Sequence, residues 1–80
     1  MIETIKFHAT WCGPCKVLSK NLEDQDLKTI DVDDDVEGLA SKFKIRNVPT
    51  LIFTKDGEEV DRIVGIITKE QYLEKLNNLQ

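Results

Sequence analysis

Both cysteines of this 80-residue chain stand in one short stretch, Thr10-Trp11-Cys12-Gly13-Pro14-Cys15-Lys16, and only two residues separate them. The stretch follows Ile2–His8, where apolar and polar residues alternate as they do in a strand. Pro14 then suits the first turn of a helix, because its missing N–H has no partner to lose there. We therefore predict a strand, a tight turn and a helix from Cys15 to about Leu22.

A second strand and a second helix are predicted next. Residues 27–32 alternate again, so two strands around a helix make a β-α-β unit with parallel strands and a right-handed crossover. An acidic run at 31 and 33–35 precedes apolar residues at helical spacing, which are Val36, Leu39, Ala40 and Phe43. We predict an amphipathic helix whose early acidic residues suit the positive end of its dipole.

The C-terminal part predicts a hairpin and a final helix. Apolar runs at 50–54 and 60–64 flank Asp56-Gly57, a strong hairpin signal. Thr68 and Gln71 have the spacing of a capping box, and the apolar face after them consists of Tyr72, Leu73, Leu76 and Leu79. The order β-α-β-α-β-β-α predicts an α/β fold, a four-stranded mixed sheet flanked by three helices, as a single domain over residues 1–80.

Composition limits the classes of function. With 40% hydrophobic residues, the chain can bury one modest core. A net charge of −4 gives no broad cationic field, so nucleic acid is not an expected partner. The sequence shows neither a basic leader nor a long apolar segment, which argues against a signal peptide or a membrane span. We expect a monomer in a reducing compartment, the cytoplasm.

The spacing of the cysteines favours exchange chemistry over a structural bridge. A bridge across so short a loop restricts the unfolded chain little, so it adds little stability. At the start of a helix, free N–H groups and the dipole favour an anion, so Cys12 is expected to ionise readily and to attack. Cys15, one turn later and facing inward, is expected to be the resolving thiol.

Zinc is the alternative for a pair with this spacing. A structural zinc site needs four ligands, and beyond the two cysteines the chain offers only His8 and carboxylates. A second Cys pair is missing, which argues against a zinc site within one chain. A zinc-bridged dimer would need two chains.

Two motifs resemble the thioredoxin family. Residues 11–16, Trp-Cys-Gly-Pro-Cys-Lys, match its active-site motif letter for letter, and residues 45–50, Ile-Arg-Asn-Val-Pro-Thr, match its proline segment. The resemblance covers essentially the whole chain but implies a minimal member, without the extra first strand and helix of longer thioredoxins. The glutaredoxin motif, usually with Pro-Tyr between the cysteines, is not matched.

The resemblance implies a protein-disulfide reductase with a redox-active Cys12–Cys15 disulfide and no bound metal or organic cofactor. Its partners would be disulfide-containing proteins and an electron-donating reductase. It also implies that Pro49 is cis and lies beside the thiols, and that the backbone of Val48 pairs with an extended substrate segment.

Further residues around the motif are expected to contact substrate. Gly65 matches the family glycine that leaves room for the partner, although a glycine that merely ends a strand is an equal alternative. Trp11 in an exposed turn, with Gly13 and Pro14 after it, is expected to cover the motif and contact partners.

Lys6 departs from the family pattern. Thioredoxins have a buried aspartate at this position, which helps to remove the proton of the resolving thiol, and a lysine across from it where our alignment places Thr29. We favour a solvated Lys6, because burying an ammonium is costly. The alternative is a Lys6 beneath the cysteines, paired with Asp31 and favouring the thiolate of Cys15. Lys20 stands where the family commonly has a proline.

Two other side chains near the motif are candidates for tuning it. His8, at the end of the first strand, is expected to be partly exposed without a catalytic role, and Lys16 is expected to be solvated or to add positive potential. On the same fold, a dithiol oxidant or isomerase is the alternative activity. A binding subunit that does not use the redox cycle is the alternative from another class.

Overall fold

The strands form one mixed sheet, in agreement with the prediction. A computed structural model describes all 80 residues and places the strands in the order β2-β1-β3-β4. β2 runs parallel to β1, whereas β3 is antiparallel to both β1 and β4. The strands are β1 (Ile2–His8), β2 (Lys28–Asp31), β3 (Thr50–Lys55) and β4 (Glu58–Val64).

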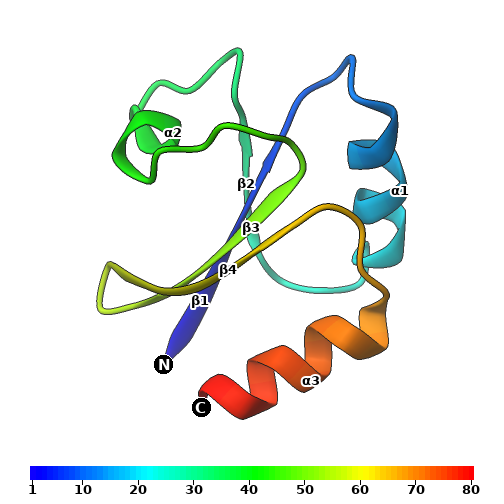
Figure 1. Cartoon of the computed structure of the whole chain (residues 1–80), viewed down its shortest axis with the longest axis vertical. Helices are drawn as coiled ribbons and strands as arrows, with labels where there is room; N and C mark the ends of the chain where they lie inside the picture. Colours follow the sequence, from blue (N-terminus) through cyan, green and yellow to red (C-terminus); the bar gives the residue numbers. More distant parts are fainter.

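Three helices flank the sheet, also as predicted, and they are α1 (Gly13–Asn21), α2 (Leu39–Lys42) and α3 (Lys69–Leu79). Figure 1 shows α1 and α3 on one side of the sheet and α2 on the other. The alternation of β3 explains this arrangement, because successive side chains point to opposite faces. Leu51 and Phe53 pack with α1 and α3, and Ile52 packs with Phe43 on the α2 side. None of the helices is long and apolar enough to cross a membrane.

The two local signals of the C-terminal part are confirmed. Asp56 and Gly57 both have positive φ, 54° and 84°, as a type I′ hairpin turn requires. Thr68 Oγ1 accepts a hydrogen bond from the N–H of Gln71, whose side chain accepts one from the N–H of Thr68. The predicted apolar face of α3 is wrong at Leu73, which is 41% exposed because the core lies on the side of Tyr72.

The second helix is much shorter than predicted, and Val36 lies outside it with 92% of its surface exposed. The acidic run makes side-chain bonds to the backbone that compete with helix formation. The Asp31 carboxylate accepts from the N–H of Asp33, and the Asp35 carboxylate accepts from the N–H groups of Leu39 and Ala40. Asp35 thus lies at the positive end of α2, and the residues before it form turns.

Candidate active site around the two cysteines

Cys12 lies at the N-cap of α1 and is joined to Cys15 by a disulfide. The chain leaves β1 through a turn in which the N–H of Cys12 donates to the carbonyl of Ala9, at 3.2 Å. Pro14 lies in the first turn of α1, as predicted, and the helix begins at Gly13. The sulfur of Cys12 accepts a hydrogen bond from the N–H of Cys15 at 3.1 Å. The helix therefore presents a backbone donor to this sulfur.

The two sulfurs differ in their surroundings less than predicted. Cys15 is 1% exposed, as expected for a thiol that faces inward, but Cys12, the expected attacking thiol, is also only 5% exposed. Ala9, Val32 and Val48 pack around the pair and cover most of Cys12. A substrate disulfide must therefore approach Cys12 past these three side chains.

The Val48–Pro49 peptide bond is cis, and this loop lies against the outer sulfur. The carbonyl oxygen of Val48 is 3.7 Å from the sulfur of Cys12. Gly65, the residue directly after β4, holds this loop in place, since its N–H donates to the carbonyl of Pro49 at 2.9 Å. Gly65 has φ +100°, and a Cβ added there would meet nothing within 4 Å. Gly65 therefore borders open space beside the loop.

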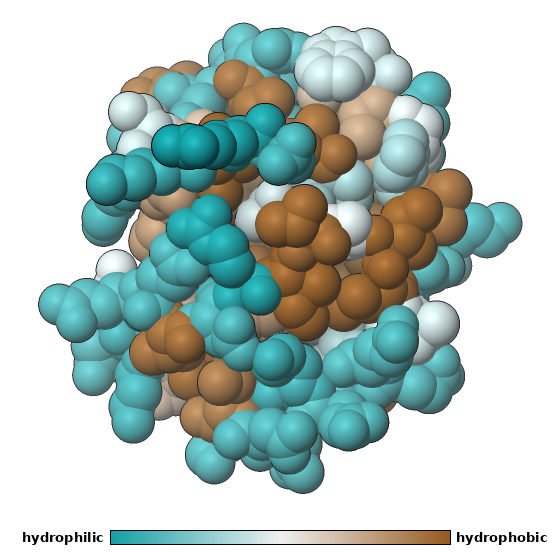
Figure 2. Space-filling view, in the orientation of Figure 1, coloured by the Kyte–Doolittle hydropathy of each residue, from teal (hydrophilic) through white to brown (hydrophobic).

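Exposed residues precede and follow Cys12 in the chain, and exposed apolar side chains also flank Gly65. Trp11 is 70% exposed, and its indole Nε1 donates to the carboxylate of Asp33 at 2.8 Å. Gly13 and Pro14 are exposed as well. Figure 2 shows an apolar area over the segment between β4 and α3, and the exposed apolar residues of this part of the chain include Val64 and Ile66. Contiguous apolar surface of this kind is typical of protein-binding sites.

Lys6 is buried, so the favoured prediction of a solvated side chain is wrong. Its side chain lies between β1 and α1 with 7% of the residue exposed, and Nζ donates to Ser19 Oγ at 2.6 Å. The predicted ion pair with Asp31 is also absent, since no carboxylate oxygen lies within 4.0 Å of Nζ. Thr29 pairs with Lys6 in the sheet, as our alignment placed it, and brings no charge. Desolvation lowers the pKa of Lys6 below its ordinary value of 10.5.

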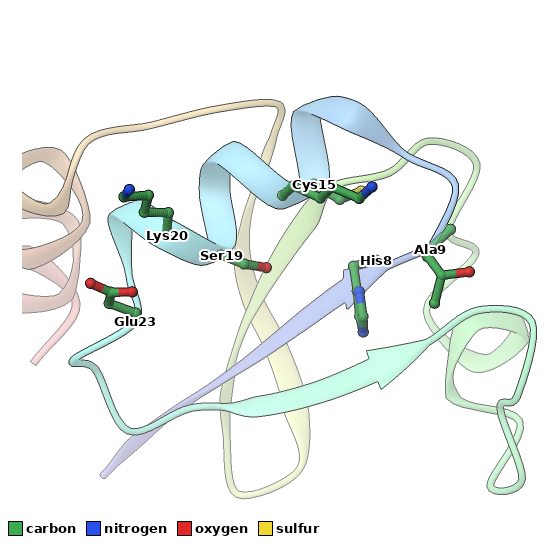
Figure 3. A pocket seen from close by; sticks show the side chains of 8 residues that line it. His8, Ala9, Cys15, Ser19, Lys20 and Glu23 are labelled. Atoms are coloured by element: carbon green, nitrogen blue, oxygen red, sulfur yellow. The ribbon is translucent and has the colours of Figure 1, made fainter.

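A surface hollow of about 580 Å³ adjoins Cys15. Figure 3 shows its lining, with Ser19 on the side of α1 next to β1 and with Lys20 and Glu23 at the far end of the helix. His8, which is half-buried, and Lys16, which is exposed, line the same hollow. Both candidates for tuning therefore line the hollow that adjoins Cys15. The structure contains no group of three or more His, Cys, Asp or Glu side chains that could hold a metal ion.

Two residues of the site, Ser19 and Asp33, are not predicted from the sequence. Ser19 follows Cys15 at i+4 and thus shares its helix face, a spacing that could have revealed it. The acidic run that contains Asp33 predicts a helix start, and nothing in the local pattern links it to Trp11, 22 residues away. Both contacts join separate elements, so local periodicity does not report them.

Comparisons with known proteins agree on one family. The family model described as "Thioredoxin" matches residues 2–78. The thioredoxin of Staphylococcus haemolyticus is 40% identical over an alignment of 84 residues, which covers 95% of this chain and 80% of the relative. The thioredoxin of Staphylococcus epidermidis is 39% identical over the same shares.

Solved structures give the same result. The thioredoxin of Malassezia sympodialis superposes with a TM-score of 0.82 and 29% identity, over 95% of this chain and 73% of that one. The germline-specific thioredoxin Deadhead of Drosophila melanogaster gives a TM-score of 0.83 at 25% identity, over 99% of this chain and 81% of that one.

Proposed function

Because this chain belongs to the thioredoxin family and is a thiol-disulfide oxidoreductase, a disulfide reductase of that type, we propose that Cys12 attacks and Cys15 resolves. The observation that carries these roles is the position of Cys12 at the helix N-cap, with its sulfur 3.1 Å from the N–H of Cys15. A hydrogen bond and the helix dipole both stabilise negative charge on that sulfur. Negative charge is therefore more stable on the sulfur of Cys12 than on that of Cys15.

The reaction runs in two exchange steps. The Cys12 thiolate attacks one sulfur of a substrate disulfide, which forms a mixed disulfide and releases the other sulfur as a thiolate. Cys15 then loses its proton and attacks the sulfur of Cys12, so that the second substrate thiolate leaves with the electron pair. The product is the Cys12–Cys15 disulfide that the structure contains. The two cysteines have then given two electrons to the substrate, and an external dithiol donor, a reductase, must return two electrons to them.

We propose that the substrates are proteins whose cystine lies in an extended segment. The exposed surface of Trp11, Gly13 and Pro14 borders the disulfide on one side. On the other side, the loop at Val48 and Pro49 lies against Cys12 and can offer backbone groups to such a segment. The open space at Gly65 leaves room for the segment beside this loop.

The proposed setting is a reducing compartment, the cytoplasm, with residues 1–80 acting as one monomeric domain. The chain has only the two cysteines of the motif, and a reducing compartment would keep them available as thiols. One continuous sheet with helices on both faces supports a single domain. The net charge of −4 gives no support to binding nucleic acid.

Reduction of insulin disulfides by a chemical reductant tests the roles. We expect the wild type to accelerate insulin precipitation and Cys12→Ser to lose this activity entirely. Cys15→Ser should accumulate a mixed disulfide, which mass spectrometry detects as an adduct on Cys12. Activity of Cys12→Ser near the wild-type level, or full turnover by Cys15→Ser without an adduct, contradicts the assignment. The reduction potential measured against glutathione separates a reductant from an oxidant or isomerase.

A further inference from the structure

Lys6 is the one charged side chain among the buried residues of this structure. Burying an ammonium is unfavourable unless it is paired and hydrogen-bonded, and this one has a single neutral partner, Ser19. A buried polar group that breaks this rule is expected at functional sites more than elsewhere. The position of Lys6 relative to the disulfide therefore needs a physical reason.

The partner of Lys6 belongs to the same helix face as the inner cysteine. Ser19 follows Cys15 by four residues on α1, and side chains at this spacing have Cβ atoms about 5–6 Å apart. The Lys6 Nζ atom lies 2.6 Å from Ser19 Oγ. Figure 3 shows Ser19 on the side of α1 next to β1. Ser19 and Cys15 also line the same hollow. The ammonium is thus bonded to the residue that lies one helical turn after the inner cysteine.

No ion pair cancels the charge of Lys6. Its sheet partners are Thr29 on β2 and Leu51 on β3, neither of which is charged. The titratable groups on the elements packed around it are His8 on β1, Asp31 on β2, Lys16 and Lys20 on α1, and Glu23 in the turn after α1. None of the carboxylates comes within 4.0 Å of Nζ. The field of the ammonium therefore reaches its surroundings through a partly desolvated region, where screening is weak.

We propose that Lys6, held in place by Ser19, is a positioning residue that stabilises the Cys15 thiolate in the resolving step. The inference rests on the proposed roles of the two cysteines. In that step the proton of Cys15 passes to water in the hollow, and its sulfur attacks Cys12. The Cys12–Cys15 bond forms, the bond from Cys12 to the substrate sulfur breaks, and the substrate thiolate leaves. The ammonium favours the state in which Cys15 carries the negative charge.

The kinetic effect depends on pH in a defined way. If the ammonium lowers the midpoint of Cys15 ionisation by about one pH unit, the thiolate fraction at pH 7 rises about tenfold. The nucleophilicity of the thiolate falls about threefold, since it follows basicity with a Brønsted slope of 0.4–0.5. The net gain at pH 7 is roughly threefold. The gain disappears at high pH, where Cys15 is fully ionised and Lys6 itself loses its proton.

Titration of a single thiol tests the charge effect directly. In a Cys12→Ser background Cys15 is the only thiol, and its ionisation is followed by thiolate absorbance. We expect Lys6→Met to raise the midpoint by about one pH unit and Ser19→Ala to raise it by less. Lys20→Met is the matched control, because it removes an exposed lysine of the same helix and should shift the midpoint by less than about 0.3 units. An unchanged midpoint in Lys6→Met, or an equal shift in Lys20→Met, overturns the proposal.

A kinetic experiment separates an electrostatic role from a structural one. With both cysteines present, release of substrate from the mixed disulfide should be roughly threefold slower in Lys6→Met at pH 7 and equal to wild type near pH 10.5. Slowing by the same factor at every pH contradicts the proposal. If Lys6→Met does not fold, Ser19→Ala provides the same comparison. Loss of insulin reduction in the wild type would refute the proposed function, whereas the titration of Cys15 reports on Lys6 alone.

Discussion

Replacement of Gly65 by alanine should impair substrate reduction more than it impairs folding. Gly65 has φ +100°, and an added Cβ would meet nothing within 4 Å, so the cost to folding is backbone strain. For an L-residue in the left-handed region this strain is about 1–2 kcal/mol. A domain of this size has a free energy of unfolding of about 4–12 kcal/mol. The variant should therefore fold, with a Tm lower by roughly 5–15 °C.

The same methyl group should interfere with a bound substrate. It would occupy the open space beside Pro49, whose carbonyl accepts the N–H of Gly65 at 2.9 Å. Forcing an extra carbon into a packed contact costs about 1–3 kcal/mol, which corresponds to a roughly 5- to 150-fold lower kcat/KM for insulin reduction. The rate at which a small dithiol reduces the enzyme disulfide should not change, because such a molecule does not need that space.

Gly57→Ala is the matched control for strain. Gly57 has φ +84° in the β3–β4 hairpin, and an added Cβ there would also meet nothing within 4 Å. It should lower the Tm by a similar amount and leave kcat/KM for insulin unchanged, with both variants assayed well below their Tm. Equal kcat/KM values for the two variants would refute the role of Gly65 in giving room to substrate.

Three further predictions concern stability. Tyr72→Phe removes the buried hydroxyl that donates to Thr4 Oγ1 at 2.9 Å, so the free energy of unfolding in urea should fall by about 1–2 kcal/mol. Adding Thr4→Val should recover part of this loss, because the unpaired hydroxyl of Thr4 is then removed as well. A further loss in the double variant would contradict the reasoning. Thr68→Ala removes the cap of α3 and should cost about 1 kcal/mol, whereas an unchanged Tm would show that the cap contributes nothing. The hydrogen bond from Lys75 holds the pKa of Asp61 below its ordinary 3.8, so this stabilisation is complete above that value and is lost as pH falls through the folded pKa. Asp61→Asn should therefore be less stable than wild type at pH 7 and equal to it near pH 2, and a gap that persists at pH 2 would contradict this.

Local signals allowed most of the fold to be predicted. The hairpin at Asp56-Gly57 and the cap at Thr68 depend on residues within four positions of each other, so the sequence displays them directly. The N-cap position of Cys12 is local in the same sense. The length of α2 could not be predicted, because the Asp35 side chain satisfies backbone N–H groups in a way that periodicity does not report.

The surroundings of the site depend on contacts between elements. Lys6 was expected in solvent because an isolated ammonium avoids burial, yet the apolar stem of lysine can pack under a helix. What decides the outcome is a hydroxyl 13 residues away on α1, which accepts from the ammonium. Knowing that α1 crosses β1 at this level would have been necessary to predict it.

Thr4 and Lys6 are the two buried polar residues of β1, and they contribute differently to stability. Thr4 bonds to Tyr72 between β1 and α3, so its polar atom is satisfied at no net cost and the bond supports the fold. Lys6 keeps a charge that desolvation disfavours, as its lowered pKa reflects, and it has only a neutral partner. An apolar side chain such as methionine would fill the same volume without this cost, so Lys6→Met is expected to be at least as stable as wild type. Lys6 therefore lowers stability, and it lies under α1, the helix that begins at the disulfide. The effect of its charge on Cys15 accounts for its presence there.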